Sequence, residues 1–188
     1  MAATVPKLDP RAEKTRAALM GAFNRLVLGR GYDEVMPARV AEAAGVARST
    51  LYEHFAGKEE MLRHSLLPIL EPLAECVDSP EVPPRLEFTL EHIRGSRRMA
   101  RELLSGRART VAARTLAQLI AARLVQLPSC RTGMPRALKV AYLASGILGL
   151  LDDWLSGREA CPVPLLAKSL QASTYAAAIA LNGEACPG

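Results

Sequence analysis

The side chains with the most chemistry to offer stand together in one short run, ARSTLYEHF at residues 47–55. Arg48, Ser49 and Thr50 present hydrogen-bonding groups in succession. An arginine can bridge both acceptors of a guanine in the major groove of DNA, while serine and threonine read bases less strictly. The run therefore indicates contacts with DNA base edges, and Arg48 as a solvated surface charge is the alternative.

Three further side chains carry donors of the kind that hold DNA phosphates. Tyr52 and His54 belong to the same run, and Lys58 follows where the next helix is expected to begin. A lysine is unfavourable at a helix N-terminus, because the helix dipole there prefers an anion. A phosphate bound by both the lysine and the free amides would remove the conflict. His54 as a residue that only packs or caps stays open, and Glu53 is expected to be an ordinary surface residue rather than a reader of cytosine.

A second run precedes the first and is the element that must support it. PARVAEAAGV at residues 37–46 carries four alanines, and its last two residues, Gly45 and Val46, are nearly all that separates its helical part from the first run. That separation is too short for anything except a tight helix-turn-helix. Gly45 suits a left-handed turn residue that ends the first of the two helices. The residues expected in the core of this motif are Val40, Ala41, Ala44, Gly45, Val46, Leu51 and Phe55.

An amphipathic helix is predicted before this motif. From residue 11 onward, apolar residues recur at helical spacing until Gly31 stops the pattern. Asp9 can cap this helix and Pro10 suits its first position. Residues 1–10 are otherwise expected to form a flexible arm. The buried stripe of the helix is expected to comprise Leu19, Phe23, Leu26 and Val27, which gives three helices closed around a minimal core.

The remainder of the chain has weaker motifs but a clear helical periodicity. An aromatic content of only 4% beside an apolar content of 49%, much of it alanine and leucine, favours helix over sheet. We therefore expect an all-α fold. Pro68 and Pro72 are expected to bend or end the first of the remaining helices. These helices are expected over residues 58–73, 84–104, 107–127, 137–155 and 164–181, with breaks at 78–84 and 128–135.

The positive charge of the chain lies mostly outside the predicted helix-turn-helix. The formal net charge is +5, but residues 1–60 hold nine Lys/Arg and eight Asp/Glu, which leaves +1. Residues 94–131 hold nine arginines and the single acid Glu102, a net charge of +8. A basic surface is typical of proteins that bind DNA. Here either one of these arginines recognises an anionic ligand or they form a solvated helix face.

Several classes of protein are disfavoured by the sequence. No apolar run approaches the roughly 20 residues that a membrane helix needs, and the N-terminus lacks a secretory core, so a cytoplasmic protein is expected. The four cysteines show no C-x-x-C spacing and are expected to be free, mostly inert thiols, with a redox switch as the alternative. No phosphate-binding glycine loop, zinc-protease motif or nucleophile elbow is present. No enzyme activity, cofactor or metal site is therefore expected.

The stretch VAEAAGVARSTLYEHFAGKEEML at residues 40–62 carries a family resemblance. Together with GY at residues 31–32 and the preceding TRAALMGAFNRL helix, it closely resembles the DNA-binding domain of the TetR family of bacterial transcriptional repressors. The resemblance implies a homodimer of helical subunits with about nine helices each. A helix-turn-helix domain is expected at residues 11–57, followed by a regulatory and dimerisation domain at residues 58–188.

Carried over residue by residue, the resemblance makes residues 47–55 the recognition helix. One position departs from the family pattern. Many members have a threonine or serine at the start of the supporting helix, whereas this chain has Met36 followed by Pro37, so only the backbone of Met36 is left to contact a phosphate there. The implied contacts place Arg48, Ser49 and Thr50 at base edges, with Tyr52, His54 and Lys58 on phosphates.

The resemblance also implies a pocket for an unidentified small-molecule effector and a dimer interface, both in the second domain. The last two long helices of each subunit would pack against those of its mate. The residues expected to line the pocket are Leu66, Leu70, Phe88, His92, Met99, Leu103 and Trp154. The residues expected at the dimer interface are Leu143, Ile147, Leu150, Leu151, Tyr175 and Ile179.

These expectations together support a repressor that binds a palindromic double-stranded DNA operator as a dimer and is released by the effector. A regulator without a ligand, controlled by a protein partner or by its own concentration, remains a rival. An enzyme on a borrowed fold is a more remote one. A monomer whose last helices form only its own core would bind just one half-site.

Overall fold

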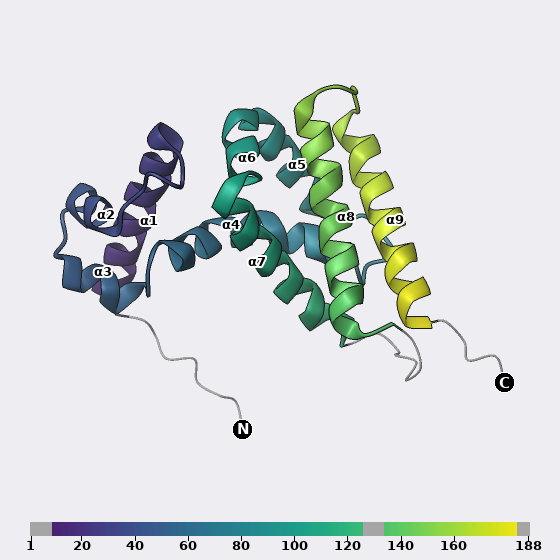
Figure 1. Ribbon diagram of the computed structural model, residues 1–188, viewed down its shortest axis with the longest axis horizontal. Helices are drawn as coiled ribbons and strands as arrows, with labels where there is room; N and C mark the ends of the chain where they lie inside the picture. The colour runs from purple at the N-terminus through teal and green to yellow at the C-terminus, as the bar shows by residue number, and fades with distance from the viewer. Residues whose placement is uncertain (1–8, 126–133, 184–188) are drawn as a thin grey trace. The chain divides into compact units, whose positions relative to one another are not determined.

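The computed structural model describes residues 9–125 and 134–183, and every secondary-structure element in these two segments is a helix (Figure 1). The predicted all-α fold with about nine helices is confirmed. The predicted flexible arm falls largely on residues 1–8, which lie outside the described residues. The helices are α1 (Pro10–Arg30), α2 (Pro37–Ala44), α3 (Arg48–His54), α4 (Lys58–Glu75), α5 (Leu86–Gly95), α6 (Arg97–Leu103), α7 (Gly106–Leu124), α8 (Arg136–Ser156) and α9 (Val163–Gly183).

The chain divides into two compact units, residues 1–65 and residues 66–188. The division falls inside α4, between Ser65 and Leu66, and not at the start of that helix. The first turns of α4 therefore belong with α1, α2 and α3, and its second half packs with the later helices. Each unit has its own buried apolar core.

The first unit is built on α1. The side chain of Asp9 accepts a hydrogen bond of 3.0 Å from the amide of Arg11, and Pro10 occupies the first helical position, as the sequence predicted. Leu19, Phe23 and Val27 are buried on one face of α1, because residues at this spacing share a side of a helix. They meet Val40 from α2 together with Leu51 and Phe55, and all three of these are at most 1% exposed.

Helix α4 continues through both of its prolines. Pro68 and Pro72 were expected to bend the helix or end it near residue 73, and α4 runs on to Glu75, so neither proline ends it. Each proline removes one internal hydrogen bond. Burial of Leu66, Leu70 and Leu73, at most 5% exposed, supplies the apolar contacts that stabilise the helix beyond them.

The predicted long helix at residues 84–104 is instead two helices. Ser96 leaves the helical region, with φ −108° and ψ 32°, and separates α5 from α6. Gly95, which precedes it, is a weak helix former, and Ser96 closes α5 by donating its amide to the carbonyl of His92. The break turns α6 away from the line of α5 and creates the extra helix.

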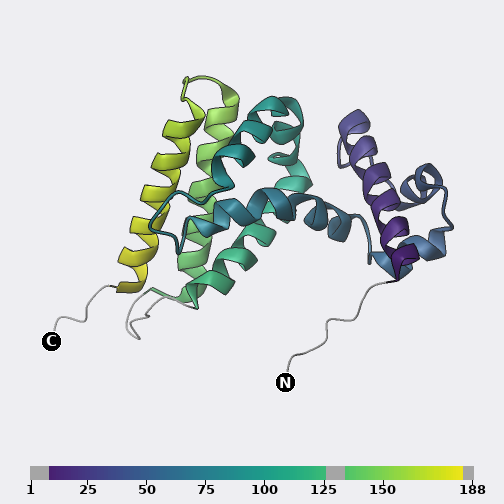
Figure 2. The same cartoon turned by 180° about the vertical axis from the view of Figure 1, so that it is seen from behind.

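In the second unit, α8 lies between α7 and α9 (Figure 1 and Figure 2). One face of α8 is buried through Leu143, Ile147 and Leu151, and α7 and α9 pack against it. Arg123 near the end of α7 contacts Glu75 and Asp78 at 3.5 and 3.1 Å, which ties α7 to the end of α4. None of the described helices combines the length and the hydropathy needed to span a bilayer.

Candidate nucleic-acid interface

The turn between α2 and α3 has the geometry that a helix-turn-helix requires. Gly45 is left-handed, with φ 68° and ψ 32°, and its amide donates to Glu42 while that of Val46 donates to Ala41. This pattern satisfies the last carbonyls of α2 and ends the helix at once. A β-carbon on residue 45 would meet no atom within 4 Å, so the turn needs glycine for its backbone conformation and not for space.

Helix α3 presents a polar face to solvent. Arg48, Ser49, Tyr52 and Glu53 are exposed, and Thr50 is half-buried. The guanidinium carbon of Arg48 lies 5.7 Å from the centre of the Tyr52 ring, a distance within the range of a cation–π contact. The two side chains that sequence reasoning assigned to a base and to a phosphate therefore lie together on one face of α3.

The C-terminal end of α3 is held by an arginine that sequence reasoning missed. Arg16 of α1 donates from Nη1 to the carbonyl of His54 at 3.3 Å, and its guanidinium lies 4.5 Å from the centre of the Phe55 ring. Its Nη2 lies 2.5 Å from Nε2 of His64 in α4. The sequence did carry a signal, because Arg16 precedes Leu19 and Phe23 at the same helical spacing and so lies in line with the buried stripe.

The environment of His64 favours its neutral form. Burial lowers the pKa of this imidazole below 6.5, and the nearby charges of Arg16 and Arg63 lower it further, while Glu60 acts in the opposite direction. The ring also meets Phe55 edge-on, with centroids 5.6 Å apart. Arg16, Phe55 and His64 form what we call the Arg16 cluster, which connects α1, the end of α3 and α4.

Lys58 is half-buried and has partners inside the protein. Its Nζ donates to the carbonyls of Tyr32 and Asp33 at 3.2 and 3.0 Å and lies 4.7 Å from the centre of the Tyr32 ring. The negative charge that the start of α4 favours comes from Glu60, whose Oε2 accepts from the amide of Ala56 at 2.6 Å. The position of Lys58 at a helix N-terminus therefore needs no phosphate to explain it. An ammonium has three donors, so one remains for an outside acceptor.

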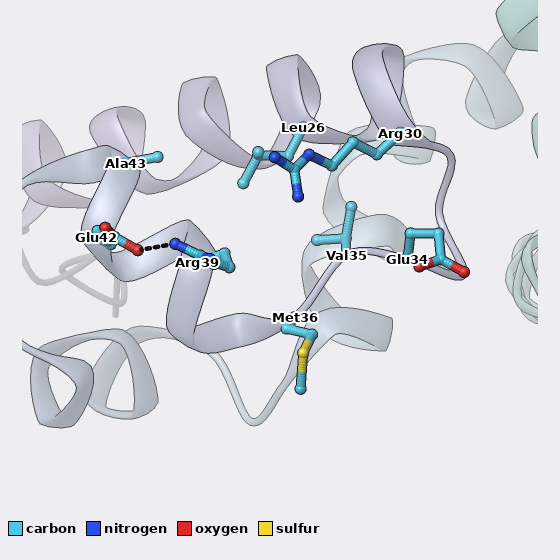
Figure 3. Close-up of a pocket in the computed structure, with 8 residues that line it drawn as sticks. All are labelled: Leu26, Arg30, Glu34, Val35, Met36, Arg39, Glu42 and Ala43. Atoms are coloured by element: carbon cyan, nitrogen blue, oxygen red, sulfur yellow. Dashed lines mark hydrogen bonds and ion pairs between the residues drawn. The ribbon is translucent and has the colours of Figure 1, made fainter.

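The start of α2 has no capping side chain. Met36 is the N-cap residue in an extended conformation, makes no side-chain cap, and is 65% exposed. Met36 borders a hollow of about 240 Å³ between the end of α1 and α2, whose polar side chains are Arg30, Glu34, Arg39 and Glu42 (Figure 3). Arg39 and Glu42 pair with each other at 2.9 Å. Two bases and two acids give this hollow no net preference for a phosphate.

The predicted pocket residues differ in how far they are exposed. Leu66 and Leu70 are packed in the core, whereas Phe88 is 76% exposed and His92 is also exposed. Met99 and Leu103 are half-buried on α6. Trp154 lines a hollow on the surface beside the turn between α8 and α9. Residues at helical spacing lie on one face of their own helix, but the spacing does not determine which neighbouring helix that face packs against.

The predicted dimer residues fall into two groups. Leu143, Ile147 and Leu151 are at most 3% exposed and pack inside the subunit. Leu150 and Ile179 are 38% and 40% exposed, and Tyr175 is half-buried. Leu138 and Tyr142, which the sequence did not single out, are 57% and 61% exposed on α8. The hydrophobic pattern alone marked α8 as apolar but did not separate its inner face from its outer one.

The described cysteines are free, and they differ in their surroundings. Cys76 is buried, which raises the pKa of its thiol to about 12, with the charge of Glu75 acting in the same direction. Cys161 is half-buried and also free. Cys130 and Cys186 lie outside the described residues. In the segments that the structure describes, no three His, Cys, Asp or Glu side chains cluster in a way that could hold a metal ion.

A left-handed glycine turn joining two short helices, with a polar second helix held on a buried three-helix core, is the architecture of a helix-turn-helix DNA-binding domain. Residues 14–64 match the family described as bacterial regulatory proteins, tetR family. This match confirms the resemblance that the sequence of the first domain predicted. None of the curated proteins matches its sequence.

Solved structures of TetR-family regulators share the fold of both units. One from Streptomyces coelicolor A3 matches with a TM-score of 0.63 and 19% identity, over 92% of this chain and 98% of its own. A TetR transcriptional regulator from Streptococcus agalactiae 2603V matches with a TM-score of 0.57 and 21% identity, over 88% and 96%. NalD, the secondary repressor of the MexAB-OprM multidrug efflux pump in Pseudomonas aeruginosa, matches with a TM-score of 0.50 and 23% identity, over 88% and 96%.

Proposed function

We propose that the protein is a transcriptional repressor that binds a palindromic DNA operator as a homodimer and releases it when a small molecule binds. The observation that supports DNA reading best is the exposed face of α3. Arg48 and Ser49 lie there beside Tyr52, on a helix whose Leu51 is fully buried. Arg48 is the residue proposed to read a guanine, with Ser49 and Thr50 reading less strictly.

The low net charge of residues 1–60 argues for binding as a dimer. Residues 1–60 carry a net charge of only +1, so a general attraction to phosphates contributes little. Affinity then depends on a few well-placed donors, which we propose to be Arg48, Tyr52, His54 and Lys58, with the Met36 backbone as a further contact. A second copy doubles these contacts and matches them to a two-fold symmetric site.

The outer face of α8 and α9 is the surface proposed for dimerisation. Leu138, Tyr142 and Leu150 are exposed along α8, and Ile179 is exposed on α9. A hollow of about 440 Å³ lies between α8 and α9 and is lined in part by Gly146 and Ala177. A β-carbon at Gly146 would meet no atom within 4 Å, so the absence of a side chain there leaves room for a neighbouring helix to approach closely.

The proposed mechanism is an equilibrium between two states of the dimer. In one state the two copies of α3 are spaced about 34 to 36 Å apart, one turn of the DNA helix, or at another spacing that matches successive major grooves. The effector binds better to a state with a different spacing. A coupling of only about 1 to 3 kcal/mol changes DNA affinity several-fold to a hundredfold, which is enough to relieve repression.

A regulator without an effector is the second candidate, and one observation favours it. The residues expected to form an effector pocket on α4 and α5 are either packed in the core, as Leu66 is, or on the surface, as Phe88 is. Control by a protein partner or by concentration would then replace control by a ligand. Tight operator binding that no small molecule weakens would support this candidate.

Selection of bound fragments from a random DNA pool, followed by sequencing, tests the proposal. We expect enrichment of a two-fold symmetric sequence. Failure to enrich any such sequence would refute repression through a palindromic operator. Sedimentation of the complex with the selected fragment would show whether two copies bind.

Arg48→Ala tests base reading directly on the selected operator. We expect a loss of about 1 to 3 kcal/mol that is concentrated at one base pair in each half-site. Arg25→Ala is the matched control, because Arg25 is also exposed but lies on α1. A loss spread evenly over all sequences would show that Arg48 holds a phosphate instead of reading a base.

A further inference from the structure

A surface hollow of about 430 Å³ lies where the start of α6 approaches the turn between α8 and α9. We call it the Trp154 hollow. Its volume falls within the range of small-molecule sites. The described α5, α6 and the α8–α9 connection lie at the same end of the second unit (Figures 1 and 2). The lining residues are Arg94, Arg97, Trp154, Leu155, Gly157, Glu159, Ala160, Cys161 and Pro162.

Arg97 is held in place from one edge of its guanidinium. Its Nε donates to the carbonyl of Leu155 at 2.6 Å, and that bond joins α6 to the end of α8. Among the described residues, neither of its terminal nitrogens has a protein acceptor. A guanidinium fixed through Nε keeps its outer pair of N–H groups in the planar fork that suits a carboxylate.

Gly157 allows the guanidinium of Arg97 to lie against the turn that ends α8. It is left-handed, with φ 73°, and a β-carbon there would lie only 1.9 Å from Nη2 of Arg97 and 2.8 Å from its guanidinium carbon. Any other residue would strain the backbone and displace the guanidinium. The turn that ends α8 therefore also provides the space that the guanidinium of Arg97 occupies.

Trp154 supplies the apolar side of the hollow. Its indole Nε1 donates to the carbonyl of Cys161 at 3.0 Å, which fixes the ring against the segment leading into α9. Trp154 is half-buried, and Leu155 and Pro162 add apolar surface beside it. A fixed aromatic ring and an arginine fork that line the same hollow suit a ligand with a flat apolar body and one anionic end.

The other charged groups of the hollow modify this preference. Arg94 pairs with Glu91 at 2.6 Å, so its charge is partly neutralised. Glu159 also lines the hollow and is exposed. The lining therefore carries two bases and one acid. This net charge of +1 favours a ligand with a single negative charge over a multiply charged anion.

We propose that the Trp154 hollow binds a small aromatic monocarboxylic acid, with Arg97 holding the carboxylate and Trp154 contacting the ring. Of the residues that the sequence assigned to a pocket, the hollow contains only Trp154. As a ligand class for the regulator, this inference rests on the proposed function. Binding of the acid itself requires neither DNA nor dimerisation.

The tryptophan reports on the site directly, because Trp154 is the only one in the chain. Titration of the full-length protein with phenylacetate, in the absence of DNA, is expected to change the tryptophan fluorescence to saturation. The neutral isostere phenylacetamide and inorganic phosphate are expected to bind at least about tenfold more weakly, since the first lacks the charge and the second lacks the ring. Equal binding of phenylacetamide or of phosphate, or no saturable response to phenylacetate, would overturn the proposal.

Two variants test the contributions of Arg97 and of Glu159 separately. Arg97→Gln is expected to weaken phenylacetate binding at least about tenfold, while Arg98→Gln, on the same helix but outside the hollow, is expected to leave it unchanged. Because Arg97→Gln also removes the bond to Leu155, Glu159→Gln provides a second test that leaves that bond intact. It is expected to strengthen binding about two- to fivefold by removing a repelling charge. Unchanged or weaker binding in Glu159→Gln, or unchanged binding in Arg97→Gln, would contradict the assignment.

Labelling of Cys161 locates the bound acid. Cys161 is one of the residues that line the hollow, so saturating phenylacetate is expected to slow alkylation of its thiol, measured by peptide mass spectrometry. Alkylation of Cys161 at an unchanged rate would place the acid elsewhere and overturn the proposal. A separate operator-release assay with phenylacetate then tests regulation, so that failure to bind the acid and failure to bind DNA remain distinct results.

Discussion

Replacing Arg16 with methionine removes the contacts that hold the end of α3. The variant loses the 3.3 Å hydrogen bond to the carbonyl of His54 and the contact with the Phe55 ring at 4.5 Å. A hydrogen bond from a charged group contributes about 1.5 to 3 kcal/mol, and a cation–π contact contributes about 0.5 to 1 kcal/mol at an exposed site. Because Arg16 is only half-buried and this hydrogen bond is long, we expect a loss of about 2 kcal/mol.

Amide hydrogen exchange is the assay that resolves this effect. The only tryptophan lies in the second unit, so its fluorescence does not report on α3. A loss of about 2 kcal/mol is expected to speed exchange in peptides from α3 and the start of α4 by about thirtyfold. Peptides from the second unit are expected to exchange at the rate of the unchanged protein.

The same variant changes the titration of His64. Arg16 is one cause of the lowered pKa of His64, so Arg16→Met is expected to raise this pKa toward 6.5, as measured by NMR. In the unchanged protein, the folded state binds a proton at His64 less readily than the unfolded state does. The resulting stabilisation is present above pH 6.5 and is lost as the pH falls from 6.5 through the lower folded-state pKa.

Arg25→Met is the control for Arg16→Met, because Arg25 is an exposed arginine on the same helix. It is expected to change neither the exchange of α3 nor the titration of His64. If Arg16→Met behaved like Arg25→Met in both measurements, the Arg16 cluster would have no part in holding α3.

Two more predictions follow from contacts of single residues. Lys58→Ala is expected to weaken binding to all DNA sequences and to reduce the slope of log affinity against log salt by about 0.9; an unchanged slope would show that Lys58 only braces the carbonyls of Tyr32 and Asp33. Cys76, whose pKa is raised to about 12, is expected to resist alkylation at neutral pH in the folded protein. Rapid labelling of Cys76 under those conditions, measured beside Cys161, would contradict its burial.

The helix-turn-helix could be predicted from the sequence because the residues that determine it are close together in the chain. Gly45 between two short amphipathic runs left a single plausible turn, and the apolar spacing fixed Leu51 and Phe55 as inward residues. With the inner face settled, Arg48 and Tyr52 had to face outward. The order and type of the helices followed from the same periodicity, except at Ser96, where a modest local preference split a predicted helix.

Only the tertiary structure decided the contacts between residues that are far apart in the chain. Arg16 meets His64, and Lys58 meets the carbonyl of Asp33, although nothing in their own segments distinguishes them from surface charges. Periodicity shows which side of a helix is buried, but it does not show which neighbour that side meets. The sequence by itself therefore determined the helix-turn-helix and its outward face. The folded chain decided what holds that helix in place and brought Arg97 beside Trp154.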